Sequence, residues 1–310
     1  MAWICYRILL GKIINEFRKE EQALNKGLFA LLIIITTSLM GSSFAIGKIG
    51  LNYISPLLLV GIRFTLAGIL MGIMVRLFKR KHPSTKREWI QIMTIGLFQT
   101  AGVMGLIFIS MRTITAGESS ILTFTNPLLV VIFGTLFLGT KYRWSQWLGV
   151  VVGFVGVFIT LGADLNVQQI GTILGFFSAV SWAIATLLMN RWGSILDVWV
   201  VTAYQMLTGG LLLLLASALF EKTVITITPN AIMIVLWLAI MASIVQFAVW
   251  FFLLQTENPG KVSSFLFLAP LFGVLFGWLL LEEQLHLSTL AGGAIILVGI
   301  YLVNRPQSTP

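Results

Sequence analysis

Residues 117–139 read "GESSILTFTNPLLVVIFGTLFLG", an apolar run with Asn126 and Pro127 near its centre. A proline inside a helix removes one backbone hydrogen bond and costs about 3 kcal/mol or more. The pattern returns 143 residues later as "GKVSSFLFLAPLFGVLFGWLLLE" at 260–282. Because the proline recurs, we predict that Pro127 and Pro270 are paired kinks in two equivalent helices that line a central cavity.

The duplication extends well beyond this stretch. The same shift places Gly134 over Gly277 and, in the next apolar run, Gly149 over Gly292. A shift of 142 places "RFTLAG", which begins at residue 63, over "QMLTGG", which begins at residue 205. The chain is therefore two copies of one structural unit.

The composition indicates a protein that lies in a bilayer. Of the 310 residues, 58% are hydrophobic and 10% are charged, and the mean hydropathy is +0.97. A soluble domain of this size carries about 25% charged residues. Packing in water does not account for such a chain, so we predict an integral membrane protein.

Ten segments are long and apolar enough to cross a bilayer as helices. They are 28–47, 56–75, 89–109, 119–138, 144–161, 170–189, 198–219, 230–254, 262–281 and 287–303. We predict an all-α membrane protein with repeat 1 over 28–162, repeat 2 over 170–304, an N-terminal tail of 1–27 and a C-terminal tail of 305–310. Because each repeat has five spans, an odd number, the second copy enters the membrane from the opposite side.

The basic residues predict the orientation. With both termini in the cytoplasm, sixteen of the 20 Lys and Arg residues lie on the cytoplasmic side, as the positive-inside rule requires. The loop at 140–143 is then cytoplasmic and basic, whereas its counterpart at 282–286 is external and carries two Glu residues. This asymmetry accounts for the net charge of +9, so a nucleic-acid partner is not predicted. The tail at 1–27 is either an amphipathic helix at the membrane surface or a basic tail without regular structure.

The repeat resembles the drug/metabolite transporter superfamily, and in particular its ten-span exporters built from two EamA repeats. The stretches that carry the resemblance are 41–51 ("GSSFAIGKIGL"), 62–70 ("IRFTLAGIL"), 119–162, 178–192 and 263–303. The family often has a Trp where Met40 lies, and Trp182 occupies that place in the second copy. An acidic residue common after the fourth span is Thr140 here and Glu283 in the second copy. The resemblance implies an inner-membrane transporter but says little about the substrate.

Polar side chains within the spans are the candidate cavity residues, because such groups are costly in contact with lipid. The candidates are Ser43, Arg63, Gln99, Thr123, Asn126, Trp182, Gln205, Gln246, Trp250 and Ser263. Ser243, Gln246 and Trp250 are three and four residues apart, which places them on one α-helical face. For each hydroxyl the alternative role is a bond within or between helices. Arg63 binds either an anionic substrate group or carbonyl groups at a helix end.

Carboxylates and metal ligands are not predicted to contribute to the cavity. No Asp or Glu lies in the middle of a span, so proton coupling through a carboxylate at the membrane midplane is not expected. The single Cys and the two widely separated His residues give no metal cluster, and we predict no cofactor. The sequence also lacks the short motifs of intramembrane catalysis, so an enzyme is not expected.

We therefore predict a plasma-membrane transporter that works by alternating access and exports a small metabolite, such as an amino acid or a related compound. The alternative is a channel or a lipid scramblase. A neutral or zwitterionic solute with an apolar part suits the amides, hydroxyls and Trp residues better than a phosphate does. Glycines spaced four apart, such as Gly149 and Gly153, favour seams between helices of one chain, so a monomer or weak homodimer is expected.

Overall fold

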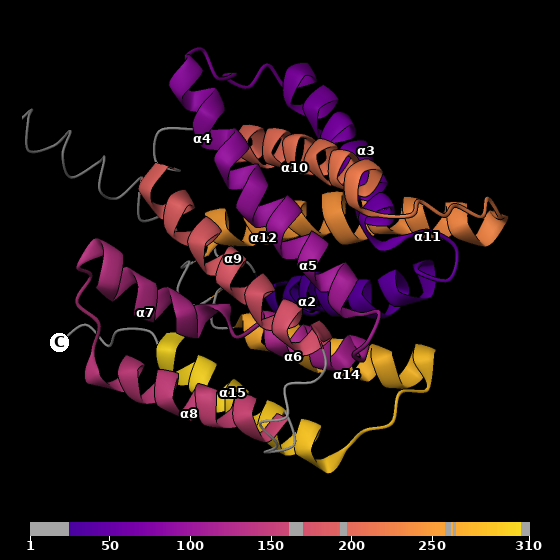
Figure 1. The fold of residues 1–310 in the computed structure, drawn as a ribbon. Helices are drawn as coiled ribbons and strands as arrows, with labels where there is room; N and C mark the ends of the chain where they lie inside the picture. The colour runs from indigo at the N-terminus through magenta and orange to yellow at the C-terminus, as the bar shows by residue number, and fades with distance from the viewer. Residues whose placement is uncertain (1–24, 161–169, 193–196, 258–261, 263–264, 305–310) are drawn as a thin grey trace, which may run out of the picture.

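The computed structural model is a bundle of helices (Figure 1). It describes residues 25–160, 170–192, 197–257, 262 and 265–304. These residues form no named strand, and one isolated β-bridge joins Ile54 to Ile225. The prediction of an all-helical protein is confirmed for this part of the chain. The predicted N-terminal tail lies almost entirely outside the described residues, as do the connection at 161–169 and the C-terminal tail.

The helices follow the predicted spans closely. Their bounds are α2 Lys26–Gly50, α3 Pro56–Leu77, α4 Lys86–Gly96, η1 Leu97–Gly102, α5 Val103–Ser110, α6 Ala116–Thr123, α7 Asn126–Leu138, α8 Trp144–Thr160, α9 Ile170–Trp192, α10 Val198–Phe220, α11 Pro229–Ala239, η2 Ile240–Val245, α12 Gln246–Thr256, η3 Phe265–Phe267, α14 Leu268–Leu281 and α15 Leu287–Asn304. The first begins earlier than predicted because Asn25 caps it, accepting a hydrogen bond from the Gly27 N–H at 3.0 Å.

Seven helical segments are long and apolar enough to cross a membrane, so the chain is a multi-pass membrane protein. Three shorter apolar helices, 144–159, 268–281 and 287–303, lie where the other three spans are predicted. The exact number of ten spans therefore stays a prediction.

Two predicted spans contain a wide π-helical turn that the sequence did not predict. In the first copy η1 lies between α4 and α5, and in the second copy η2 lies between α11 and α12. The two π turns, at 97–102 and 240–245, are 143 residues apart, which is the repeat shift. Single π turns are rare and occur frequently at functional sites. The repeat thus extends to this local distortion.

The prolines lie where the helices restart. The helix α6 ends at Thr123, and Pro127 is the second residue of α7. At this position a proline is tolerated, because the N–H that it lacks would have no partner within the helix. Pro270 is the third residue of α14, which follows the short 3₁₀ turn η3. Both apolar runs are therefore interrupted before the proline, rather than bent at it.

The closest helix pairs join elements of different copies. The helix α8 packs against α15, α3 against α10, and α2 against α14 (Figure 1). Glycines permit these approaches: a Cβ atom added at Gly149 in α8 would lie 2.7 Å from the carbonyl oxygen of Gly299 in α15. Each copy therefore packs mainly against helices of the other copy.

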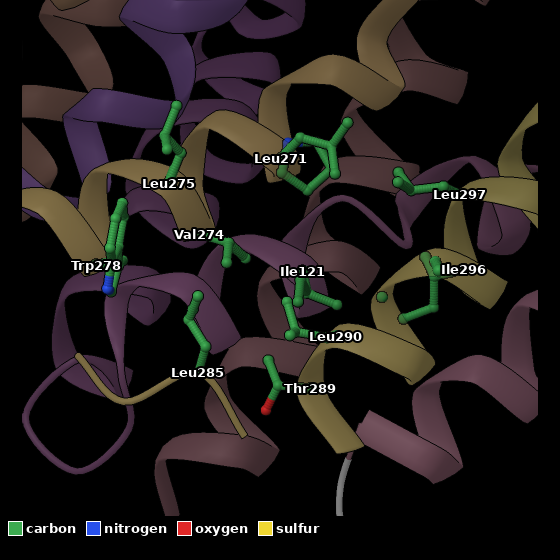
Figure 2. Close-up of a pocket in the computed structure, with 13 residues that line it drawn as sticks. Ile121, Leu271, Val274, Leu275, Trp278, Leu285, Thr289, Leu290, Ile296 and Leu297 are labelled. Atoms are coloured by element: carbon green, nitrogen blue, oxygen red, sulfur yellow. The ribbon is translucent and has the colours of Figure 1, made fainter. Parts of the chain in front are cut away.

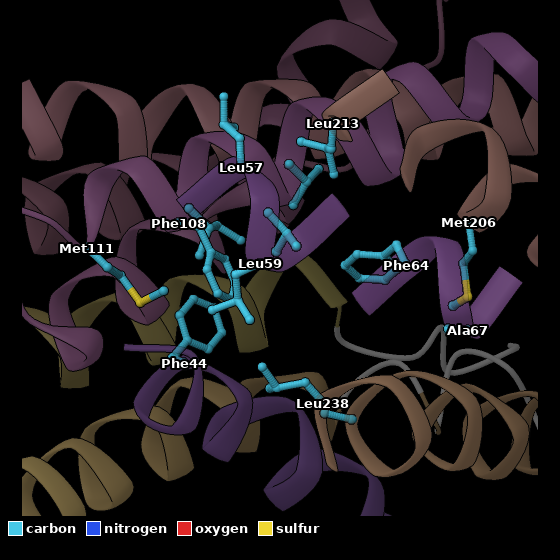
Figure 3. Close-up of a cluster of buried hydrophobic side chains, with 14 of the residues drawn as sticks. Phe44, Leu57, Leu59, Phe64, Ala67, Phe108, Met111, Met206, Leu213 and Leu238 are labelled. Carbon is cyan, nitrogen blue, oxygen red and sulfur yellow. The ribbon is translucent and has the colours of Figure 1, made fainter. Parts of the chain in front are cut away.

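The largest buried cluster lies between α2, α3, α5, α10 and α11 (Figure 3). Phe44, Phe64, Phe108, Met206 and Leu238 are among its members, and all five are buried. In a bilayer such side chains gain little by leaving lipid, so close packing is what stabilises the contact.

Candidate functional site

A cavity of about 390 Å³ lies among helices of both copies. Its walls come from α2, α4, η1, α7, α8, α9, α10, α12 and α15. The lining residues are Met40, Ile95, Gln99, Asn126, Pro127, Val130, Val131, Tyr142, Gln146, Trp182, Thr186, Met189, Val201, Thr202, Gln205, Phe247, Trp250, Phe251, Leu266 and Val303. A volume of this size accommodates a small metabolite.

Helical spacing sets one wall of the cavity. Trp182, Thr186 and Met189 are four and three residues apart on α9, so they form one face along its C-terminal half. Across from them, α7 begins with Asn126 and Pro127, where the preceding helix has stopped. The cavity therefore extends from the middle of α9 toward its C-terminal end.

Aromatic side chains close the inner end of the cavity. Trp182 packs edge-on against Phe124, with ring centroids 5.2 Å apart, and Phe124 packs against Phe44 at 6.3 Å. Phe124 and Phe44 belong to the large buried cluster. These three rings separate the cavity from the end of the bundle at which α6 begins.

The polar groups of the cavity are amides and hydroxyls, together with the indole N–H groups of Trp182 and Trp250. The amides are those of Gln99, Asn126, Gln146 and Gln205, and the hydroxyls are those of Tyr142, Thr186 and Thr202. None of the residues that line the cavity carries a formal charge at neutral pH. Burial raises the pKa of the Tyr142 phenol above its usual value, so this group also stays neutral. The cavity offers hydrogen bonds without an ionic partner.

The structure brings together six of the twelve residues predicted from the sequence. They are Gln99, Asn126, Pro127, Trp182, Gln205 and Trp250. Gln205 has a fixed orientation, because its side-chain oxygen accepts a hydrogen bond from the Thr100 hydroxyl at 2.6 Å. Five of the six are amides or aromatic residues, and they come from both copies.

Arg63 lies outside the cavity lining, in α3. Its side chain is buried, and it donates hydrogen bonds to the Ser243 hydroxyl at 3.0 Å and to the Ala242 carbonyl at 2.8 Å. Both acceptors belong to the π turn η2. Of the two roles considered for Arg63, the structure therefore shows the contact with a carbonyl group.

Three further predicted residues have other neighbours. Ser43 donates a hydrogen bond to the Met40 carbonyl of its own helix at 2.7 Å. Thr123 shares a hydrogen bond with Ser178 across the α6–α9 contact at 2.8 Å. Gln246 is buried outside the cavity lining, and its side-chain nitrogen has no hydrogen-bond partner among the described residues. Ser263 lies outside the described residues.

Pro270 lines a second cavity instead of the first. This cavity, of about 250 Å³, lies between α14 and α15 beside Ile121 of α6, and its lining is almost entirely apolar (Figure 2). Leu271, Leu275 and Trp278 of α14 point into it (Figure 2). Pro127 and Pro270 thus hold matching places in the repeat but line different cavities.

Several lining residues were not predicted from the sequence. Helical spacing could have indicated Thr186 and Thr202. Thr186 lies one helical turn from Trp182, and Thr202 lies three residues before Gln205. Tyr142 and Gln146 had no such signal, because both lie at the boundary of a polar connection. Tyr142 reaches the cavity by folding back on α7, where its hydroxyl lies 3.5 Å from the Val130 carbonyl oxygen.

The described carboxylates lie at helix ends and in connections. None of them lines the cavity, and the described residues contain no cluster of His, Cys, Asp or Glu that could hold a metal ion. Glu118 is engaged in capping α6, where it accepts a hydrogen bond from the Thr115 N–H at 3.0 Å. A proton-binding carboxylate in this cavity therefore has no support in the described structure.

The fold and the cavity define a multi-pass helical membrane protein with a central solute-sized site. The EamA-like transporter family matches this chain twice, over residues 27–162 and 169–305. The chain belongs to this family, and it is a membrane transporter.

Curated relatives have similar lengths. The chain is 32% identical to the uncharacterized transporter YvbV of Bacillus subtilis, over 89% of this chain and 91% of the relative. It is 30% identical to the uncharacterized inner membrane transporter YedA of Escherichia coli, over 87% of each. A solved crystal structure with 20% identity superposes with a TM-score of 0.65, covering 88% of this chain and 96% of the other, which supports the fold alone.

Proposed function

We propose that this transporter moves a small neutral or zwitterionic metabolite with an apolar part, such as an amino acid, out of the cytoplasm by alternating access. The supporting observation is the cavity itself, since its amides, hydroxyls and aromatic rings come from both copies and none of its lining side chains is charged. A solute with a net charge would leave its ionic group unpaired in this site, which is costly away from water. The proposed movement involves no chemical step.

We further propose that ten spans form two inverted repeats with both termini in the cytoplasm, in the plasma membrane. Two observations support the architecture of two repeats: the π turns recur at the repeat shift, and the closest helix pairs join the two copies. Secondary transporters of this design bind their solute near the midplane, where the repeats meet. The cavity then faces the cytoplasm, because it extends toward Tyr142 and the basic connection that contains it.

The chain works as a monomer or a weak homodimer in this proposal. The glycines at the closest helix crossings contact other helices of the same chain, as Gly149 does with Gly299. Among the described residues these glycines are therefore used within one subunit, and the same surfaces are not free to join two chains.

The test begins with a growth-rescue screen, in which cells that overproduce the protein are challenged with toxic amino acids and analogues. The compound that gives rescue is then measured in proteoliposomes by saturable uptake and counterflow. Gln99→Leu removes a lining amide at nearly constant volume, and we expect it to raise KM about tenfold through the loss of hydrogen bonds. Ser43→Ala is the matched control, because the Ser43 hydroxyl bonds within its own helix and lies outside the cavity lining.

Two results would contradict the proposal. Flux that never saturates and shows no counterflow would indicate a channel instead of a carrier. Equal KM values for the Gln99→Leu and Ser43→Ala variants would remove this cavity from the substrate path.

A further inference from the structure

Glu283, which follows α14, joins three parts of the bundle at one end. Its carboxylate accepts hydrogen bonds from the backbone N–H groups of Ala116 at 2.7 Å and Gly117 at 3.2 Å, which begin α6. It also forms an ion pair with the Lys48 amine of α2 at 3.3 Å. Lys48 in turn donates to the carbonyl of Ile114 at 2.8 Å. We call this set of contacts the outer latch.

The physical setting favours a strong contact. The Glu283 side chain is only 10% exposed, and its partners are a cation and the positively polarised N-terminus of a helix. Hydrogen bonds of an ionised group in such surroundings are about twice as strong as neutral ones. The outer latch ties α14 of the second copy to α2 and α6 of the first.

The outer latch lies at the end of the bundle opposite Tyr142. The segment that starts with Ala116 at the latch finishes at Leu138, directly before the connection that carries Tyr142. The aromatic rings of Trp182, Phe124 and Phe44 lie between this end and the cavity. In the proposed orientation the latch is external, and it closes the side that the cavity does not reach.

The repeat shows where a second latch would lie, at the other end of the bundle. The backbone there is the same: Gly139 and Glu282 both have positive φ values, of 63° and 54°. The N–H of the next residue bonds to the carbonyl of Gly134 in one copy at 3.0 Å and of Gly277 in the other at 3.3 Å. That next residue is Thr140 in the first copy and Glu283 in the second.

The sequence lacks the carboxylate that the second latch would need. The carboxylate of Glu283 is replaced by the hydroxyl of Thr140. The counterpart of Ala116 is Pro259, which has no N–H to donate. The shift of 142 that relates the earlier spans places Asn190 over Lys48, with Arg191 as the next residue. One end of the transporter therefore has a charged latch, and the other end cannot form the same one.

Other ion pairs lie at both ends of α10. Arg80, after α3, pairs with Asp197 at the start of α10 at 3.4 Å, and Arg112, after α5, pairs with Glu221 at the end of α10 at 3.8 Å. The contacts of Glu283 stabilise closure of one side alone.

We propose that Glu283 and Lys48 hold the external side shut and so set the resting state of the transporter, with the cavity open to the cytoplasm. This inference rests on the alternating access proposed above. A contact present in only one of two states shifts their populations by its differential free energy. Each export cycle then requires the latch to break. The strength of the latch sets the fraction of the protein whose cavity is open to the cytoplasm.

The test is thiol accessibility in intact cells, and it needs no substrate. The single native cysteine is first replaced by Cys5→Ser, and a reporter is introduced as Ser120→Cys. Ser120 is buried in α6 against α14, where its hydroxyl lies 3.4 Å from the Pro270 carbonyl oxygen. A membrane-impermeant maleimide is then added outside, with and without Glu283→Gln.

We expect Glu283→Gln to raise external labelling of the reporter about tenfold, since weakening of hydrogen bonds to a charged group shifts a two-state equilibrium by that order. Glu282→Gln is the matched control, because the neighbouring carboxylate is not part of the latch, and it should leave labelling unchanged. Lys48→Met is the second latch variant, and it should act in the same direction. Size-exclusion profiles select variants that are correctly folded.

Unchanged labelling in folded Glu283→Gln and Lys48→Met variants would overturn the latch. Labelling raised equally by Glu282→Gln would also overturn it, because the effect would then follow from loss of charge in general. The results distinguish failure of the latch from failure of the proposed transport. A shift in labelling without any saturable flux supports the latch and contradicts the proposed transport, whereas saturable flux without a shift contradicts only the latch.

Discussion

Arg63 and Ser243 form a hydrogen bond between the two copies, with the guanidinium Nε atom 3.0 Å from the serine hydroxyl. The counterpart is the bond between Gln205 and Thr100 at 2.6 Å, since the repeat places Arg63 over Gln205 and Thr100 over Ser243. In each case a long polar side chain from the second span of one copy holds the π turn of the other copy. The two bonds differ chemically but have the same position.

The first prediction concerns Arg63→Ala. Because Arg63 bonds to the π turn η2 and lies outside the cavity lining, we expect a lower maximal rate of transport, by about tenfold, with KM changed by less than about twofold. The measurement is counterflow in proteoliposomes over a range of substrate concentrations. A rise in KM at constant maximal rate would instead make Arg63 a substrate ligand.

The second prediction concerns the seam between α8 and α15. Gly149→Ala places a Cβ atom 2.7 Å from a backbone oxygen of Gly299, so we expect a loss of about 1–3 kcal/mol in stability. Thermal unfolding in detergent, followed by fluorescence-detected size exclusion, measures this loss. Gly72→Ala is the matched control, since a Cβ atom there has no heavy atom within 4 Å. Equal unfolding temperatures for the two variants would show that the seam is not as close as described.

The third prediction concerns Tyr142 and pH. Burial raises the pKa of the Tyr142 phenol above its usual value of about 10, so the hydroxyl keeps its proton and can donate below that pH. Its contribution is present at low and neutral pH and is lost as the pH rises through the raised pKa. We expect Tyr142→Phe to raise KM by about twofold to tenfold, with the ratio to wild type constant from pH 6 to 9. A ratio that fell to one within this range would show that the phenol ionises there.

The fourth prediction concerns proton coupling. Because no described carboxylate lines the cavity, a pH gradient alone should not drive uphill movement of the substrate. Proteoliposomes with an imposed gradient test this, with Glu118→Gln and Glu257→Gln as variants that remove the acids nearest to span ends. Strong uphill movement that survives both substitutions would require a coupling group that the described cavity does not contain.

The fifth prediction concerns Thr123, which the sequence placed in the cavity. Its hydroxyl bonds to Ser178 across the contact of α6 with α9, so Thr123→Val should cost about 1 kcal/mol of stability and leave KM unchanged. Unfolding and counterflow of the same preparation measure both quantities. A clear rise in KM with unchanged stability would assign Thr123 to the substrate.

The sequence is enough to predict the apolar spans, because a helix makes its own backbone hydrogen bonds and its apolar side chains suit the surrounding lipid. The sequence indicates only part of the site, and η2 shows one reason. Ser243, Gln246 and Trp250 have α-helical spacing, yet Trp250 lines the cavity while Ser243 bonds to Arg63. A π turn takes one residue more than an α turn, so residues on either side of it do not keep a common face.

Hydrophobicity and its repetition are properties of the chain alone, so the amino-acid order is enough to predict a helical membrane protein built from two copies. Which polar groups share a cavity, and which bond to a neighbouring helix, depends on how the helices pack. Arg63 and Gln205 are equivalent in the repeat, and only Gln205 lines the cavity. The reason is that the direction in which a side chain points depends on helix crossings and local turns. These arise from contacts between segments more than a hundred residues apart.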